Sequence, residues 1–192
     1  IKYYTDTRWI IDKCWRIKMT NNDILIRLRY ALNIKDADMV EIFRMGGIEL
    51  TKAEVQKMLI NPKKNTTTEV EKSEPIVNEE LKVCDNFMLE SFLNGLIISQ
   101  RGRKETTGDD IQKPELMIKN ERSVNNVLLK KVKIALSLTS DDILDMLDEA
   151  GVRISNSELS AVLRKEGHRN YKECGDRYAR NFLKGLALRY RG

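Results

Sequence analysis

The residues that best suggest a function form a basic segment at the C-terminal end of the chain. Residues 174–192 contain five Lys or Arg side chains and a single acid, Asp176. At about 100° per residue, an α-helix would gather four of the five within an arc of about 60°. These candidate polyanion-binding residues are Arg177, Arg180, Lys184 and Arg191. Such a face can neutralise phosphates and release their counterions, so it suits nucleic-acid binding.

Two other interpretations of this basic face remain open. Residues 134–163, directly upstream, contain six acids and one basic residue, Arg153. The basic face could pair with these acids inside the fold or across a self-associated pair of chains, or it could bind an acidic protein. The net charge of +5 decides little, because residues 1–18 alone contribute +3 of it. A nearly balanced body is a weak argument for a polyanion partner.

Three cysteines and one histidine limit the chemistry further. Cys84 and Cys174 each precede a predicted final helix, and a helix N-terminus can lower a thiol pKa and make the sulfur reactive. We favour the alternative that both are small buried residues, and we interpret His168 as a surface loop residue. So few Cys and His residues exclude most metal clusters and a disulfide framework, and we expect no metal and no cofactor.

The chain contains none of the linear motifs of phosphate-binding loops, dinucleotide sites, serine hydrolases or zinc proteases. A site assembled across the fold needs no linear motif, so an enzyme with a pocket between the two halves remains the least favoured hypothesis. Residues 41–59 have the helix, glycine turn and helix of a DNA-reading helix-turn-helix. The aligned segment 155–163 has no basic residue, however, which favours a plain αα-hairpin with Gly47 at a helix end.

The elements that position these residues are predicted to occur twice. Residues 21–59 align without gaps on 125–163, with nine of 39 positions identical, and residues 84–102 align on 174–192, with seven of 19 identical. Apolar residues recur at helical spacing and no period-two run suggests a strand. The sequence thus predicts an all-α fold: two tandem copies of a four-helix unit, related by internal duplication and packed as a helical pseudo-dimer.

The predicted boundaries follow from composition. Residues 19–102 form copy 1, with a loop insertion at 61–79, and residues 122–192 form copy 2. Residues 103–121 read as a linker. We interpret residues 1–18 as a non-native or upstream extension before Met19. The alternative is a short amphipathic helix that docks both tryptophans of this segment on the body.

Other residues predict where helices begin and where two helices pack closely. Thr51 with Glu54, and Ser155 with Glu158, have capping-box spacing, and Asp36 is predicted to cap the helix that follows it. The motif F-L-x-G-L occurs in both copies and places a glycine in mid-helix, which predicts a close helix–helix approach, at the boundary between the copies. The candidate helix-packing or interface residues are Phe92, Gly95, Leu96, Phe182, Gly185 and Leu186.

Four segments of the sequence resemble the YehS-like family of small bacterial proteins. They are residues 21–32 (N-N-D-I-L-I-R-L-R-Y-A-L), 92–97 (F-L-N-G-L-I), 154–164 (I-S-N-S-E-L-S-A-V-L-R) and 182–191 (F-L-K-G-L-A-L-R-Y-R). The resemblance begins at Met19 and continues to residue 192. It implies a duplicated domain of unknown function in a cytoplasmic bacterial protein, and it implies no activity, cofactor or catalytic residue.

These observations favour a protein that binds rather than catalyses. We expect a protein-interaction or regulatory module with a protein partner or self-association. The alternative is nucleic-acid binding, to RNA or DNA, through the basic face of the C-terminal helix. No apolar stretch is long enough to cross a bilayer, so we expect no membrane partner.

Overall fold

The computed structural model describes residues 18–60, 81–102 and 116–191. Nearly all of the predicted extension 1–18, the insertion 61–79 and most of the linker 103–121 lie outside the described residues. Within the described ranges the chain forms helices joined by turns and loops, without a strand. The prediction of an all-α fold is confirmed for this part of the chain. None of its helices is long and apolar enough to span a membrane.

Eight helices occur in the described residues. They are α2 (Asn21–Ala31), α3 (Asp36–Met45), α4 (Lys52–Met58), α5 (Asn86–Arg101), α6 (Val124–Ala135), α7 (Ser140–Glu149), α8 (Asn156–Val162) and α9 (Asp176–Arg191). We refer to α2–α5 as the N-terminal set and to α6–α9 as the C-terminal set.

Capping boxes begin several of these helices. The predicted box of Thr51 and Glu54 starts α4, and that of Ser155 and Glu158 starts α8. The prediction for Asp36 is wrong: Lys35 occupies the N-cap of α3 without a side-chain cap. Asp36 lies in the first turn of α3, where its carboxylate accepts a hydrogen bond from Arg29 at 2.5 Å and is therefore not available to the helix end.

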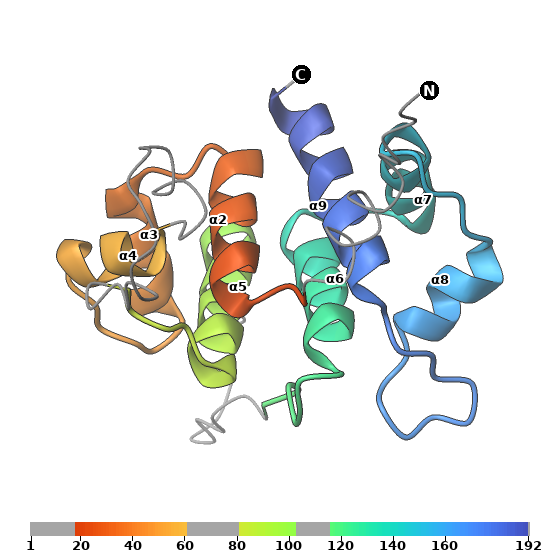
Figure 1. Ribbon diagram of the computed structural model, residues 1–192, viewed down its shortest axis with the longest axis horizontal. Coiled ribbons are helices and arrows are strands. Elements are labelled where there is room, and N and C mark those ends of the chain that lie inside the picture. The colour runs from red at the N-terminus through yellow and green to blue at the C-terminus, as the bar shows by residue number, and fades with distance from the viewer. Residues whose placement is uncertain (1–17, 61–80, 103–115, 192) are drawn as a thin grey trace, which may run out of the picture.

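Four helices run side by side in the same direction at the centre of the molecule. They are α2, α5, α6 and α9 (Figure 1). At their N-terminal ends, the Asn21 amide donates to Asn86 Oδ1 at 2.8 Å and the Asn125 amide donates to Asp176 at 2.8 Å. At the opposite end, Arg101 donates to the Ile134 carbonyl at 3.2 Å. All four N-termini thus lie at one end of this bundle and all four C-termini at the other.

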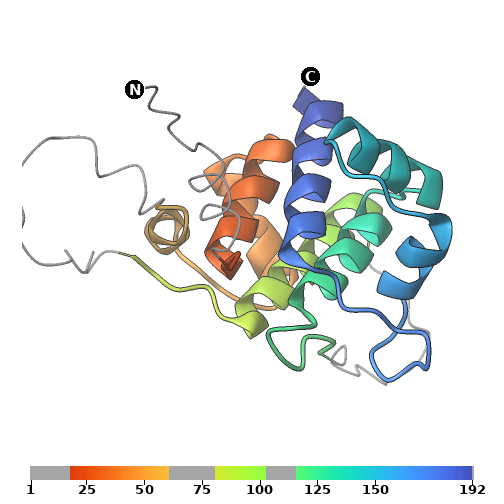
Figure 2. The same cartoon turned by 45° about the vertical axis from the view of Figure 1, so that its right-hand side comes forward.

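The remaining helices flank the bundle. α3 packs on both α5 and α4, and α7 packs on both α9 and α8. Figure 2 shows α9 lying between α2 and α7. Because α3 with α4, and α7 with α8, return the chain to the starting end, the central helices of each set can run in parallel.

The two sets pack through their central helices. α5 contacts α6, and α2 contacts α9, so the first helix of each set lies against the last helix of the other. Buried residues of both sets form one continuous hydrophobic cluster, which includes Phe92 and Phe182. The core is therefore shared, as expected for units too small to bury a large core alone.

Gly95 and Gly185 mark close helix contacts, but these lie within each set. A Cβ on Gly95 would lie 1.8 Å from the Ile42 carbonyl oxygen of α3, and one on Gly185 would lie 2.1 Å from that of Met146 on α7. The sequence placed these contacts at the boundary between the copies, whereas the glycines face a helix of their own set. Sequence periodicity gives the face of a helix but does not identify its neighbour.

Candidate functional site

The basic face predicted on α9 is divided among different neighbours. Arg177 and Lys184 are exposed, and Lys184 Nζ donates to the carbonyl of Ala150 at 3.3 Å. The Arg180 guanidinium is partly buried and lies 3.9 Å from the Asp176 carboxylate. Arg191 lies across the boundary between the sets, with its guanidinium carbon 4.3 Å from the centre of the Tyr30 ring.

Two of the acids upstream of α9 pair with arginines outside this face. Asp142 accepts a hydrogen bond from Arg189 at 2.6 Å, and Asp148 accepts one from Arg153 at 2.5 Å. Hydrogen bonds from the Thr139 hydroxyl and amide, with that from Arg189, lower the pKa of Asp142 to about 2. Arg189 thus pairs with α7 although the helical projection did not place it on the basic face.

Cys84 and Cys174 are buried, with 2% and 3% of their surfaces exposed. Burial raises the pKa of each thiol to about 12, and the neighbouring Asp85 and Asp176 act in the same direction. Both thiols stay protonated at neutral pH, which supports the interpretation of small buried residues and not that of a reactive pair.

His168 lies in the loop between α8 and α9 and is exposed. Its Nδ1 accepts a hydrogen bond from the Asn170 amide at 3.2 Å and lies 3.2 Å from the Arg164 guanidinium. The histidine therefore organises the loop. Among the described residues, no three or more His, Cys, Asp or Glu gather in a way that could hold a metal ion.

The segment proposed as a helix-turn-helix consists of α3 and α4. Gly47 follows α3 with a positive φ of 91°, and the side chains that α4 exposes include Lys52 and Lys57. Glu54, on the same short helix, is held by Lys82 at 2.6 Å. α4 spans only seven residues, so its arrangement with α3 fits the αα-hairpin interpretation.

Asn22 and Asn126 have a structural role that sequence analysis did not assign. The Asn126 amide donates to the carbonyls of Val162 and Lys172 at 2.8 Å each, and its oxygen accepts from the Cys174 amide at 2.9 Å. Asn22 makes the matching three bonds in the N-terminal set. Their identity in the alignment was the available signal, but it did not indicate packing or function.

A buried ion pair joins the two sets. Glu90 is 0% exposed and Lys131 is 5% exposed, and Lys131 Nζ lies 2.8 Å from Glu90 Oε1. The same carboxylate accepts hydrogen bonds from the backbone amides of Met117 and Ile118, at 2.7–2.9 Å. Lys131 also donates to Asn94. Two residues of the predicted linker, Met117 and Ile118, are thus fixed to α5 by a carboxylate whose two oxygens both accept hydrogen bonds.

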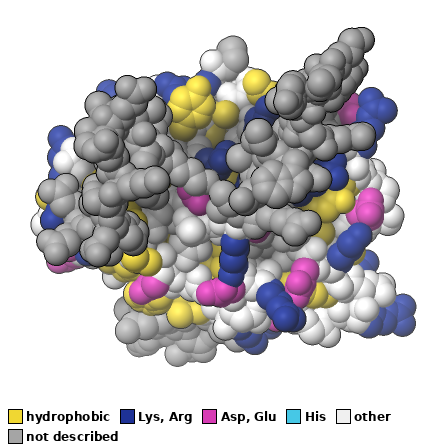
Figure 3. All heavy atoms as spheres, viewed as in Figure 1, with side chains coloured by type: hydrophobic (Ala, Val, Ile, Leu, Met, Phe, Trp, Pro, Cys, Tyr) yellow, Lys and Arg dark blue, Asp and Glu magenta, His cyan; other side chains and the backbone are white. Residues whose placement is uncertain are grey.

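The C-terminal end of the central bundle exposes large hydrophobic side chains. Tyr30 is 60% exposed, Tyr190 47%, Leu188 46% and Ile134 38%. Figure 3 shows hydrophobic side chains at the upper end of α2 and α9, whereas basic and acidic side chains alternate over the lower half of the visible surface. Aromatic side chains and arginine are enriched in protein interfaces.

A cavity of about 340 Å³ opens beside this exposed surface. Its lining includes Leu32, Asp38, Ser99, Leu136 and Tyr190, so both sets contribute to it. This volume lies in the range of binding pockets for small groups. We call the four exposed side chains together with this cavity the open end of the bundle.

The two sets differ at one polar position of the open end. Asp38 aligns with Asp142, and Ser99 aligns with Arg189. Arg189 pairs with Asp142 in the C-terminal set, while Asp38 has neither a salt bridge nor a side-chain hydrogen bond among the described residues. The cavity therefore lies where the other set places a guanidinium.

Comparisons with known proteins point to the family that the sequence resembles. The family described as "Protein of unknown function (DUF1456)" matches residues 21–102 and 125–192. The uncharacterized protein YehS of Escherichia coli (strain K12) is 37% identical over 171 residues, which are 89% of this chain and 96% of that protein. No solved structure matches the chain.

Proposed function

Because the chain belongs to the family of proteins of unknown function DUF1456, we propose its function from its structure: a non-catalytic module that binds a protein partner. The exposed aromatic and aliphatic side chains of the open end carry this proposal. Tyr30 and Tyr190 present ring surface without being buried in the shared core. Tyr and Arg side chains at the centre of an interface supply much of its binding energy.

The architecture proposed for this module is a duplicated four-helix unit packed as a pseudo-dimer. The helices α2–α5 recur in order as α6–α9, with lengths of 11, 10, 7 and 16 residues against 12, 10, 7 and 16. The contacts also recur, since α3 packs on α5 as α7 packs on α9. This repetition supports copies at 19–102 and 122–192.

The cavity beside Asp38 indicates which chemistry the partner offers. In the C-terminal set, Arg189 fills the corresponding place and donates to Asp142 at 2.6 Å. In the N-terminal set, Ser99 is too short to do so and the cavity remains. The partner we propose inserts an Arg or Lys side chain beside Asp38 and packs apolar surface against the exposed tyrosines.

A non-catalytic role is supported by the hydrogen bonding and protonation of the buried ionisable groups. Glu90 uses both carboxylate oxygens to hold Lys131 and backbone amides, so it has no oxygen free to act as a base. Cys84 and Cys174 stay protonated. These groups stabilise the fold. Two free buried thiols also fit a reducing compartment, and we propose the bacterial cytoplasm.

Photo-crosslinking tests the proposed surface. Benzoylphenylalanine would replace Tyr190, which lines the cavity, in the full chain produced in Escherichia coli. We expect a discrete protein adduct at this position and none at the control position Lys57, which is exposed on α4. The decisive comparison adds Ser99→Arg, which places a guanidinium beside Asp38 and should abolish the adduct.

Two results would contradict this proposal. An adduct that forms equally with and without Ser99→Arg would show that the cavity takes no part in binding. An adduct of the mass of two chains would identify a second copy as the occupant instead of a basic partner. The Ser99→Arg variant should unfold at or above the temperature of the unchanged protein, since Asp38 would gain a partner.

Nucleic-acid binding through α9 is the second candidate, and the exposure of Arg177 and Lys184 favours it. Anisotropy with labelled RNA and DNA at about 50 and 200 mM salt tests it, because four phosphate contacts predict an affinity loss of about a hundredfold over this range. Arg177→Glu with Lys184→Glu should abolish binding, whereas Lys52→Glu with Lys57→Glu should not. The absence of binding at low salt would exclude this candidate.

A further inference from the structure

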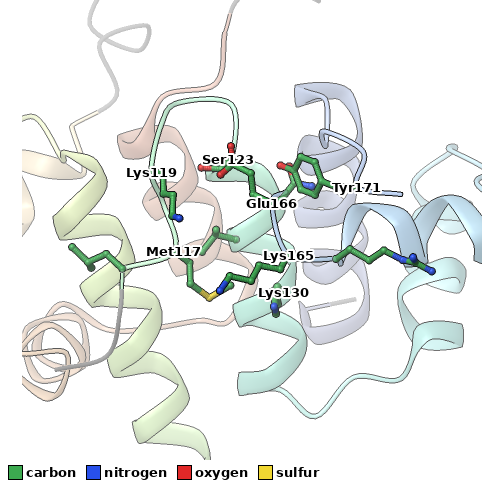
Figure 4. Close-up of a pocket in the computed structure, with 11 residues that line it drawn as sticks. Met117, Lys119, Ser123, Lys130, Lys165, Glu166 and Tyr171 are labelled. Atoms are coloured by element: carbon green, nitrogen blue, oxygen red, sulfur yellow. The ribbon is translucent and has the colours of Figure 1, made fainter. Parts of the chain in front are cut away.

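A second cavity lies at the other end of the molecule from the exposed tyrosines. It is bounded by the segment before α6, by α6 itself and by the loop between α8 and α9. Met117, Val127 and Tyr171 form apolar walls, and Lys119, Lys130 and Lys165 stand around it. Figure 4 shows Lys165 reaching toward Met117, with Lys119 on the other side and Tyr171 above.

The three lysines differ from neighbouring lysines in their ion pairing. Within the described part of the chain, none of them forms a salt bridge, although neighbouring lysines do: Lys131 pairs with Glu90 and Lys172 with Glu158. Glu166, the one acid that lines the cavity, accepts a hydrogen bond from the Asn120 amide at 3.0 Å. Four of the lining residues, including Arg164, are basic and one is acidic, so the lining carries a net positive charge that favours a bound anion.

The apolar walls of the cavity indicate which kind of group the anion is attached to. The side chains of Met117 and Val127 offer no hydrogen bond, so an apolar group displaces water there at little cost. Burial raises the pKa of Tyr171, so its hydroxyl stays protonated and can donate to an anion. The enclosed volume of about 40 Å³ holds only a few heavy atoms of a ligand, so the rest of its body lies in the rim, which stays open to solvent.

We propose that this cavity binds a small organic anion, in which an oxyanion headgroup held by Lys119, Lys130 and Lys165 is joined to a compact apolar body. A carboxylate and a phosphate monoester share this chemistry. The site is independent of the protein-binding surface proposed above, since the two lie at opposite ends of the bundle and share no residue.

The methyl group of Met117 reports on binding. Its NMR signal, assigned by Met117→Leu, would be followed while phenyl phosphate and benzoate are titrated into the full chain. We expect a saturable shift with at least one of the two, and the stronger response identifies the headgroup. Inorganic phosphate and benzyl alcohol, which carry only one half of the chemistry, should bind about tenfold more weakly or more weakly still.

Variants that remove the lysine charges test the role of these lysines in binding. Lys119→Gln with Lys165→Gln should weaken binding about tenfold or more, since each lysine supplies a charge-assisted hydrogen bond. Both side chains are exposed, so the fold is preserved. The matched control is Lys52→Gln with Lys57→Gln, two exposed lysines on α4, which should leave the affinity within about twofold.

Three outcomes would overturn the inference. The first is the absence of a saturable Met117 shift with either aromatic anion. The second is an equal loss of affinity in the control variant, which would show only general attraction to a basic protein. The third is binding of inorganic phosphate as tight as that of phenyl phosphate, which would remove the role of the apolar walls. None of these affects the crosslinking test of the open end.

Discussion

At the scale of single residues, the Asn126 side chain connects three segments through three backbone groups. Asn126→Ala would leave two carbonyls and one amide without partners in a buried place. We expect this to lower the free energy of unfolding by about 3 kcal/mol. The same loss is expected for Asn22→Ala, as measured by urea denaturation. Asn21→Ala, which removes one partly exposed bond to Asn86, is the control and should cost about 1 kcal/mol.

Asp142 is expected to make the stability of the fold depend on pH. Hydrogen bonds from Thr139 are the main cause of its lowered pKa of about 2, and Arg189 adds to them. The unfolded value is about 3.9, so the stabilisation is complete above pH 4 and disappears as the pH falls through about 2. Thr139→Ala should raise the pKa of Asp142 toward its ordinary value in an NMR titration of the carboxyl carbon. An unchanged midpoint would contradict the proposed cause.

At the scale of helices, Gly95 and Gly185 allow α5 and α9 to approach their neighbours. Alanine is favoured over glycine inside a helix by about 1 kcal/mol, yet Gly95→Ala should destabilise the protein by about 3 kcal/mol or more. The reason is the carbonyl oxygen of Ile42, which lies 1.8 Å from the place of the new Cβ and belongs to the backbone. Thermal unfolding followed by circular dichroism measures the difference.

Gly175→Ala is the control for this prediction. A Cβ at Gly175 would meet no atom within 4 Å. Its substitution should change stability by about 0.5 kcal/mol or less. If Gly95→Ala proved equally harmless, α3 and α5 would not approach as closely as described.

At the scale of the whole molecule, Glu90 and Lys131 connect the two sets. Glu90→Ala should cost about 3 kcal/mol or more, because it leaves a buried ammonium without its partner. Glu90→Gln with Lys131→Met should cost much less, because both charges are removed together. Hydrogen exchange at the Ile118 amide supplies the specific readout, since Glu90 accepts its hydrogen bond at 2.7 Å. Protection of that amide in Glu90→Ala would contradict the role assigned to the carboxylate.

The sequence by itself determined the helices and the family. Hydrophobic periodicity and capping residues such as Thr51 are local signals, so they indicated where most helices lie without any knowledge of the fold. The alignment of the two halves likewise required no structure. Asp36 shows the limit of local reasoning, because an arginine of the preceding helix, α2, binds the carboxylate that local spacing assigned to a cap.

Only the tertiary structure decided which faces meet. The glycines of F-L-x-G-L pack against α3 and α7. Asp142 pairs with Arg189 and not with the predicted basic face, and Glu90 pairs with Lys131. The tertiary structure also formed both cavities, since their lining comes from segments far apart in the chain. The physical reason is that a helical repeat fixes the angle of a side chain about its own axis, whereas packing of the whole core fixes what lies opposite.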